Sequence, residues 1–230
     1  MKLYNNLINE IKGCLTNARI LENGNLLNTS DKNSIIFLSD TAFELGGSQT
    51  PCVSSLAVSS DTTFSNSVYL LGNDLNEIKS DSPFCKFVFI QIEDFDDEQN
   101  TFNKIKELEA LRYHLSIDGF MTRASALNMR EQVRVSKKTI KSGISFADYG
   151  KTLLSKYLEY NFVKSAEIYL VTDLIDFEKL NSFAKKISQT TSALNHIFDN
   201  VMFDCSTCNL KEICDEVDGL KELHLKTVKK

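Results

Sequence analysis

The sequence predicts an α/β (or α+β) fold, in which a mixed sheet is covered by helices and followed by a short Cys-rich helical tail. Short runs rich in Ile, Val, Phe and Tyr alternate with longer amphipathic segments, a pattern typical of strands and helices. Only 2 prolines and 9 glycines interrupt the 230 residues, which favours regular structure. Between residues 131 and 198 the order is strand, helix, strand, helix, as in strands of one sheet that helices cover.

In the first half of the chain, three apolar runs predict strands: SIIFLS (34–39), SVYLLG (67–72) and FCKFVFIQIE (84–93). Turn-forming Asn, Asp, Ser and Gly residues bound these runs. From Phe102 to about Leu127, apolar residues recur at helical spacing with lysines and glutamates between them, which predicts one amphipathic helix or two. The apolar positions are Ile105, Leu108, Leu111 and Leu115.

In the second half, EQVRVSK (131–137) alternates apolar and polar residues, as a strand does. The segment 145–162 begins with a Ser, has an acidic residue soon after, and continues at helical period, which predicts a helix. AEIYLVTD (166–173) predicts the next strand, and residues 176–198 predict the next long helix. We place a domain boundary near residue 200, which gives an α/β domain (1–200) and a Cys-rich metal-binding tail (201–230).

Composition excludes several classes of protein. With 42% hydrophobic and 25% charged residues, a chain of this length can bury one sizeable core. The net charge of −5 does not favour nucleic-acid binding. The longest apolar runs, such as 87–92, are far shorter than the ~20 residues of a membrane-spanning helix, and the opening residues do not resemble a signal peptide. We therefore expect a cytoplasmic protein whose cysteines are thiols or metal ligands.

The candidate metal ligands lie close together in the tail, in the segment FDCSTCNLKEICDEVDGLKELH (203–224). Cys205 and Cys208 form a C-x-x-C pair, which lets a tight turn present two thiolates to one metal. Cys214 and His224 follow, and soft thiolates select zinc or an iron–sulfur cluster, both of which accept four ligands. Spacing alone leaves zinc, a cluster and unliganded thiols open, and His224 is either a ligand or a surface residue of a helix.

The remaining candidates have structural interpretations. Cys14, Cys52 and Cys85 are expected to be small buried hydrophobic residues, although any of them could complete the metal site. His114 and His196 lie in predicted helices and are expected to serve packing or the surface. The Gly-rich GGSQT (46–50) predicts a turn. The sequence has no G-x-S-x-G elbow, G-x-x-x-x-G-K-[ST] loop or H-E-x-x-H helix.

One stretch, QVRVSKKTIKSGISFADYGKTLLSKYLEYNFVKSAEIYLVTD (132–173), resembles the middle domain of the CO-methylating acetyl-CoA synthase, the β-type catalytic subunit of the CO dehydrogenase/acetyl-CoA synthase complex. The similar features are an R-[VI]-S-K strand, a G-x-x-x-x-x-x-G segment leading into a helix, and a strand that ends in T-D. TAFELGG (41–47) resembles the family's P-A-F-E-L strand, and residues 103–128 resemble the helical stretch before R-x-S-K. The resemblance covers roughly residues 35–224.

The resemblance also extends to the tail. In that family a C-x-x-C, a third cysteine and a fourth ten positions later hold a [4Fe–4S] cluster. Cys205, Cys208 and Cys214 match the first three, with a shorter gap between the second and third, and His224 stands where the fourth would be. The resemblance thus implies a Cys₃His cluster site and favours iron–sulfur over zinc.

The departures from the family matter as well. The family binds two nickel ions with a further Cys-Gly-Cys segment, which has no counterpart here, so we do not expect nickel in this chain alone. The family's tryptophan, associated with coenzyme A, is replaced by Gln132. What remains of the coenzyme A region is a set of cations: Arg130, Arg134, Lys137, Lys138 and Lys141. Arg134 and Lys138 would share one face of a strand. They either bind a phosphate-bearing or acidic partner or form a solvated basic edge that balances the acidic run 93–98.

Three functions follow from these observations. The first is an acetyl-CoA synthase-related iron–sulfur protein of one-carbon metabolism, an accessory or partial subunit acting with other CO dehydrogenase/acetyl-CoA synthase or corrinoid protein subunits. The second is a residual CO-methylating acetyl-CoA synthase with nickel ligands from elsewhere. The third is a zinc-stabilised structural or interaction protein without catalysis.

Overall fold

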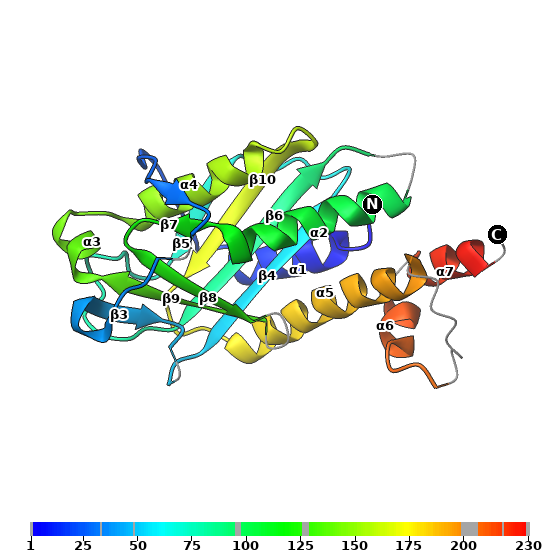
Figure 1. The fold of residues 1–230 in the computed structure, drawn as a ribbon. Coiled ribbons are helices and arrows are strands. Elements are labelled where there is room, and N and C mark those ends of the chain that lie inside the picture. The colour runs from blue at the N-terminus through cyan, green and yellow to red at the C-terminus, as the bar shows by residue number, and fades with distance from the viewer. Residues whose placement is uncertain are drawn as a thin grey trace.

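The described residues form two main sheets with helices packed on them. The computed structural model describes residues 2–32, 34–47, 49–94, 98–125, 129–198, 207–217 and 219–228. Within these residues there are a mixed five-stranded sheet, a three-stranded antiparallel sheet and a short two-stranded ladder (Figure 1). The predicted fold class, a mixed sheet covered by helices, is therefore confirmed.

The large sheet has the strand order β1-β5-β10-β6-β4. The strands are β1 (Arg19–Leu21), β5 (Ser67–Leu71), β10 (Val163–Val171), β6 (Phe84–Ile92) and β4 (Cys52–Ser59). β5 pairs with β10 and β4 with β6 in parallel, whereas β1–β5 and β10–β6 are antiparallel. Every residue of β4 is buried, although β4 is an edge strand of this sheet, because α1, α5 and β9 pack against it.

The smaller sheet has the order β3-β9-β8. Its strands are β3 (Thr41–Leu45), β9 (Arg130–Ser136) and β8 (Phe120–Ser125), and the two-stranded ladder joins β2 (Thr29–Ser30) to β7 (Ser116–Ile117). The backbone N–H of Ser54 in β4 donates to the carbonyl of Met129, next to β9, at 2.7 Å. This bond ties the smaller sheet to the edge of the larger one.

Seven α-helices lie within the described ranges. They are α1 (Asn5–Cys14), α2 (Glu98–His114), α3 (Lys137–Lys141), α4 (Phe146–Leu158), α5 (Phe177–Phe198), α6 (Lys211–Glu216) and α7 (Leu220–Val228). α4 packs on β10 and β5, and α5 packs on β4. Figure 1 shows α5 leading away from the sheet to α6 and α7, which lie at the opposite end of the molecule from α3.

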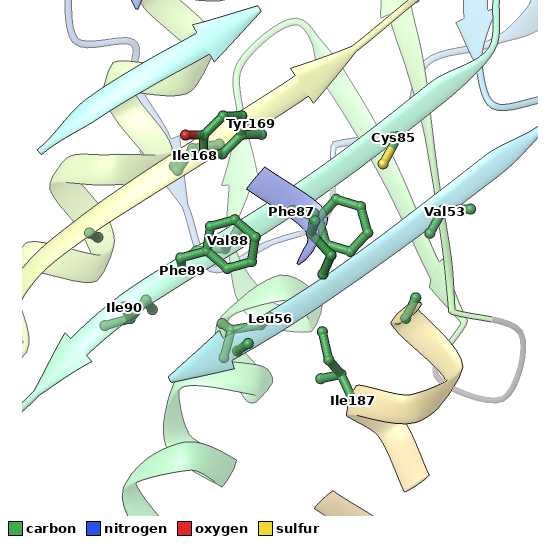
Figure 2. Close-up of a cluster of buried hydrophobic side chains, with 14 of the residues drawn as sticks. Val53, Leu56, Cys85, Phe87, Val88, Phe89, Ile90, Ile168, Tyr169 and Ile187 are labelled. Atoms are coloured by element: carbon green, nitrogen blue, oxygen red, sulfur yellow. The ribbon is translucent and has the colours of Figure 1, made fainter. Parts of the chain in front are cut away.

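The core is centred on β6 and its neighbours. Figure 2 shows Phe87 and Phe89 of β6 close to Tyr169 of β10, with Leu56 of β4 and Ile187 of α5 nearby. The ring centroids of Phe87 and Phe89 are 6.1 Å apart, and those of Phe89 and Tyr169 are 5.7 Å apart. Aromatic pairs at such separations contribute beyond the area they bury. This packing holds α5 in place, and α5 in turn positions the tail.

The start of α4 explains the G-x-x-x-x-x-x-G pattern. Ser145 and Asp148 form a capping box at its first turn, which satisfies N–H groups that have no partner within the helix. Gly143 has a φ of +72°, and a Cβ on Gly150 would lie 2.4 Å from Cγ1 of Val68 in β5. The first glycine therefore permits the turn, and the second lets α4 approach the sheet closely.

Most predicted elements are confirmed: β5, β6, β9, β10, α4 and α5 lie where the sequence predicts them. The predicted strand at 34–39 is wrong, because Ile35 and Phe37 are 76% and 68% exposed and no strand within the described residues pairs with this segment. The segment instead runs into a short 3₁₀ helix at Leu38–Asp40. The helix predicted for 102–127 is correct only to His114, since Gly119, with a φ of +85°, turns the chain into β8.

Candidate functional site

A cavity of about 100 Å³ lies between the end of α5 and the two tail helices. It is lined by Cys208, which precedes α6, by Cys214 on α6, and by His224 on α7. His196 of α5 lines the same cavity. Three of the four residues singled out in the tail therefore face one cavity, and Cys205 lies outside the described residues.

The tail helices are fixed by apolar contacts with α5 and by ion pairs. Ile213 of α6 and Leu220 and Leu223 of α7 are buried, which places the cysteine and histidine side chains beside α5. Asp215 accepts hydrogen bonds from Lys211 at 2.6 Å and from Lys221 at 3.0 Å. These hydrogen bonds lower the pKa of Asp215, and they link α6 to the start of α7.

The thiols and imidazoles that line the cavity are donors of the kinds that soft metals bind. Within the described residues, however, no three His, Cys, Asp or Glu side chains are grouped closely enough to hold a metal ion. The metal site and its ligands therefore stay a prediction. His196 was expected to serve packing or the surface, yet it lines the cavity. Its neighbours Ala193 and Ile197 on α5 line the cavity too, but no local sequence pattern links this part of α5 to the cysteine segment.

The other three cysteines differ in their surroundings. Cys52 and Cys85 are buried, as predicted, whereas Cys14 is only partly buried. Burial raises the pKa of the Cys52 and Cys85 thiols, so both are poor sources of thiolate.

Both arginines of the predicted basic cluster hold the smaller sheet together. The Arg134 guanidinium lies 2.6 Å from the Glu44 carboxylate and donates to the carbonyl of Ile36 at 2.8 Å. Arg130 donates to the carbonyls of Gly46 and Gly47, each at 3.2 Å. These contacts fix the turn after β3, where GGSQT begins.

Lys137 and Lys138 lie on a helix, α3, and not on the predicted strand. Lys138 does not continue the face of the strand, because β9 ends at Ser136 and α3 begins at Lys137. The Ser136 hydroxyl accepts from the N–H of Thr139 and caps the helix. Lys137 and Lys138 line a cavity of about 620 Å³, together with Thr139 of α3, the serines that cap this helix, and Asp40 and Asp118. Lys137 also donates to the Ser39 carbonyl at 2.8 Å.

A buried ion pair joins the two sheets, and sequence reasoning missed it. Lys86 of β6 donates to Glu131 of β9, and their side chains are 4% and 2% exposed. The Ser54 hydroxyl donates to the other carboxylate oxygen of Glu131 at 3.1 Å, and Nε of Arg112 lies 3.8 Å from that oxygen. Burial lowers the pKa of Lys86, and attraction to Glu131 opposes that shift.

The fold and this arrangement define an α/β protein with a thiol-lined cavity where its last long helix meets a Cys-rich tail. The family model described as CO dehydrogenase/acetyl-CoA synthase complex beta subunit matches residues 33–177, more than half of the chain. The chain therefore belongs to that family. The match contains the whole of 132–173, where the resemblance is strongest, and ends before the cysteine tail. A search of curated proteins found no significant match.

Membership in this family links the chain to the CO dehydrogenase/acetyl-CoA synthase complex. Among the described residues, none of the helices combines the length and the apolar character that crossing a membrane requires.

Proposed function

We propose that this chain is an iron–sulfur protein of one-carbon and acetyl-CoA metabolism, acting as an accessory or partial subunit with other chains of the complex or with corrinoid protein subunits. The observation that carries the proposal is the placement of Cys208, Cys214 and His224 around one cavity. Family membership supports the setting. Cys205, two residues before the described segment 207–217, supplies the third thiolate, and the bound cluster would supply electron-transfer or acyl-group chemistry.

His196 gives the site a second imidazole. It is held on α5, whereas His224 comes from α7. The fourth ligand of the proposed site is therefore one of these two histidines, since cluster sites accept His in place of Cys.

Ligand variants test the proposal. The full chain is reconstituted anaerobically with iron and sulfide, and its visible absorbance is compared with that of Cys205→Ser, Cys208→Ser and Cys214→Ser. The broad brown absorbance should be lost or strongly reduced in each variant. Cys14→Ser is the matched control, because this partly buried cysteine does not line the cavity. An unchanged spectrum in Cys208→Ser would contradict the cluster assignment.

The same samples separate the alternatives. A single zinc without sulfide would identify the tail as a structural clasp, with folding of the tail dependent on the metal. Nickel-dependent exchange of an acetyl carbonyl group with CO would identify a residual acetyl-CoA synthase whose nickel ligands come from elsewhere.

A second part of the proposal concerns coenzyme A. We propose that its phosphates are received beside Lys137 and Lys138, because these lysines line the large cavity at α3, while Arg130 and Arg134 are engaged by carbonyls and by Glu44. In a binding titration, Lys138→Gln should lower the affinity for coenzyme A by about tenfold. Lys141→Gln, on the same helix but outside the lining of the cavity, should leave the affinity unchanged, and equal loss in both variants would contradict the assignment.

A further inference from the structure

A second polar cavity lies between α2 and α5, above β4. Its volume is about 330 Å³. α2 contributes Lys106, Glu109 and Arg112 to its lining, and α5 contributes hydroxyls and the amide of Asn195. None of these residues belongs to the basic cluster near α3 or to the cysteine tail, so the cavity requires its own explanation.

The guanidinium of Arg112 is only partly satisfied by hydrogen bonds within the described residues. Its side chain is 12% exposed, and its Nε lies 3.8 Å from Glu131, which is beyond hydrogen-bonding distance. Among the described residues, neither Nε nor Nη2 has a hydrogen-bond partner. Glu131 is meanwhile engaged by Lys86 and Ser54. Leaving two buried nitrogens of a guanidinium without hydrogen bonds is costly, so a further acceptor near Arg112 would stabilise it.

The two unpartnered nitrogens are well suited to such an acceptor. Nε and Nη2 form one edge of the guanidinium plane, the arrangement that binds both oxygens of a carboxylate or phosphate group. Among the described residues no hydrogen bond holds this edge, and its ion-pair contact is with Glu131, 3.8 Å from Nε.

The charges around the cavity favour an anion. The cations are Lys86, Lys106 and Arg112, and the acids are Glu109 and Glu131, which leaves a surplus of one positive charge. Burial raises the pKa of Glu109, and attraction to Arg112 and Lys106 opposes that shift. A cavity with excess positive charge concentrates anions.

We propose that the cavity between α2 and α5 binds a small oxyanion, a phosphate or carboxylate group, through Arg112 and Lys106, with Asn195 and the hydroxyls of α5 as additional donors. This site goes beyond the proposed metal centre and does not depend on it. His196 lines both cavities, so the anion would lie across one imidazole from the thiol-lined cavity.

Calorimetric titration of the full chain tests the proposal, with inorganic phosphate and acetate as separate probes at constant ionic strength set by chloride. We expect saturable binding of at least one probe with one site per chain. The probe that binds tells a phosphate site from a carboxylate site. Lys106→Gln should weaken that binding by about tenfold.

Lys104→Gln is the matched control. Lys104 lies on the same helix, pairs with Glu107 at 2.9 Å and does not line the cavity. Lys104→Gln therefore changes the net charge by as much as Lys106→Gln does, but should leave the affinity for the anion unchanged. Arg112→Gln should abolish binding. If that variant fails to fold, the comparison of Lys106→Gln with Lys104→Gln decides alone, because both side chains lie at the helix surface. Absence of saturable binding for both probes, or equal affinities in these two variants, would overturn the proposal.

Discussion

The buried ion pair between Lys86 and Glu131 makes a sharp prediction about stability. Glu131→Gln removes the only carboxylate that contacts Lys86 among the described residues, and leaves the Lys86 ammonium and the Arg112 guanidinium without it. Both cations are largely buried, so we expect a loss of about 3–5 kcal/mol in the free energy of unfolding. For a domain of this size that corresponds to a fall in Tm on the order of 10 °C.

Lys86→Met should cost less, because it preserves the volume of the side chain and leaves Glu131 with Arg112 3.8 Å away and the Ser54 hydroxyl at 3.1 Å. The double variant should be more stable than the sum of the two single losses predicts, by about 1–3 kcal/mol. Urea denaturation followed by circular dichroism gives the free energies by linear extrapolation. A loss below about 1 kcal/mol for Glu131→Gln, or strictly additive losses, would refute this reasoning.

Three further predictions concern the helices and the tail. Gly150→Ala should lower the Tm, because the new Cβ would lie 2.4 Å from a methyl group of β5, whereas Gly13→Ala, with nothing within 4 Å, should raise stability by about 0.5–1 kcal/mol. Asp148→Ala should cost about 1–3 kcal/mol at pH 7 in urea denaturation, through loss of the capping box. Burial would raise the pKa of Asp148, but the N–H groups of Asn25 and Ser145 outweigh it and lower that pKa. The stability that ionised Asp148 contributes is therefore complete above its unfolded pKa of about 3.9 and is lost as the pH falls through its lower folded pKa. The difference in unfolding free energy between Asp148→Ala and wild type should shrink accordingly in acid. His224→Cys should retain the proposed cluster and lower its reduction potential in redox titration, since thiolate replaces neutral imidazole; loss of the cluster would argue against a ligand role for this position.

Local patterns predicted the elements whose apolar residues face the core. β6 and β10 are apolar runs bounded by turn residues, and they form the centre of the sheet. β4 escaped notice because PCVSSLAVSS places serines within a buried strand. The run at 34–39 was wrongly predicted as a strand because its apolar residues Ile35 and Phe37 are exposed and not part of the core. Hydrophobicity alone does not report whether a partner strand is present.

Sites assembled from distant segments are harder to predict. The spacing of Cys208, Cys214 and His224 was sufficient to group them, because they lie close together in the sequence. His196 joins their cavity from another helix. Lys86, Glu131 and Arg112 come from β6, β9 and α2, and only tertiary structure brings their charges together. The prediction that Lys138 shares a strand face with Arg134 was wrong, because Ser136 ends the strand and caps the start of a helix.

The most direct test of the central claim is the content of iron, zinc and acid-labile sulfide in the full chain after anaerobic purification, measured on one sample. The proposal that the tail holds a cluster predicts about four iron and four sulfide per chain, with little zinc. One zinc per chain without sulfide, or no metal at all, would contradict it.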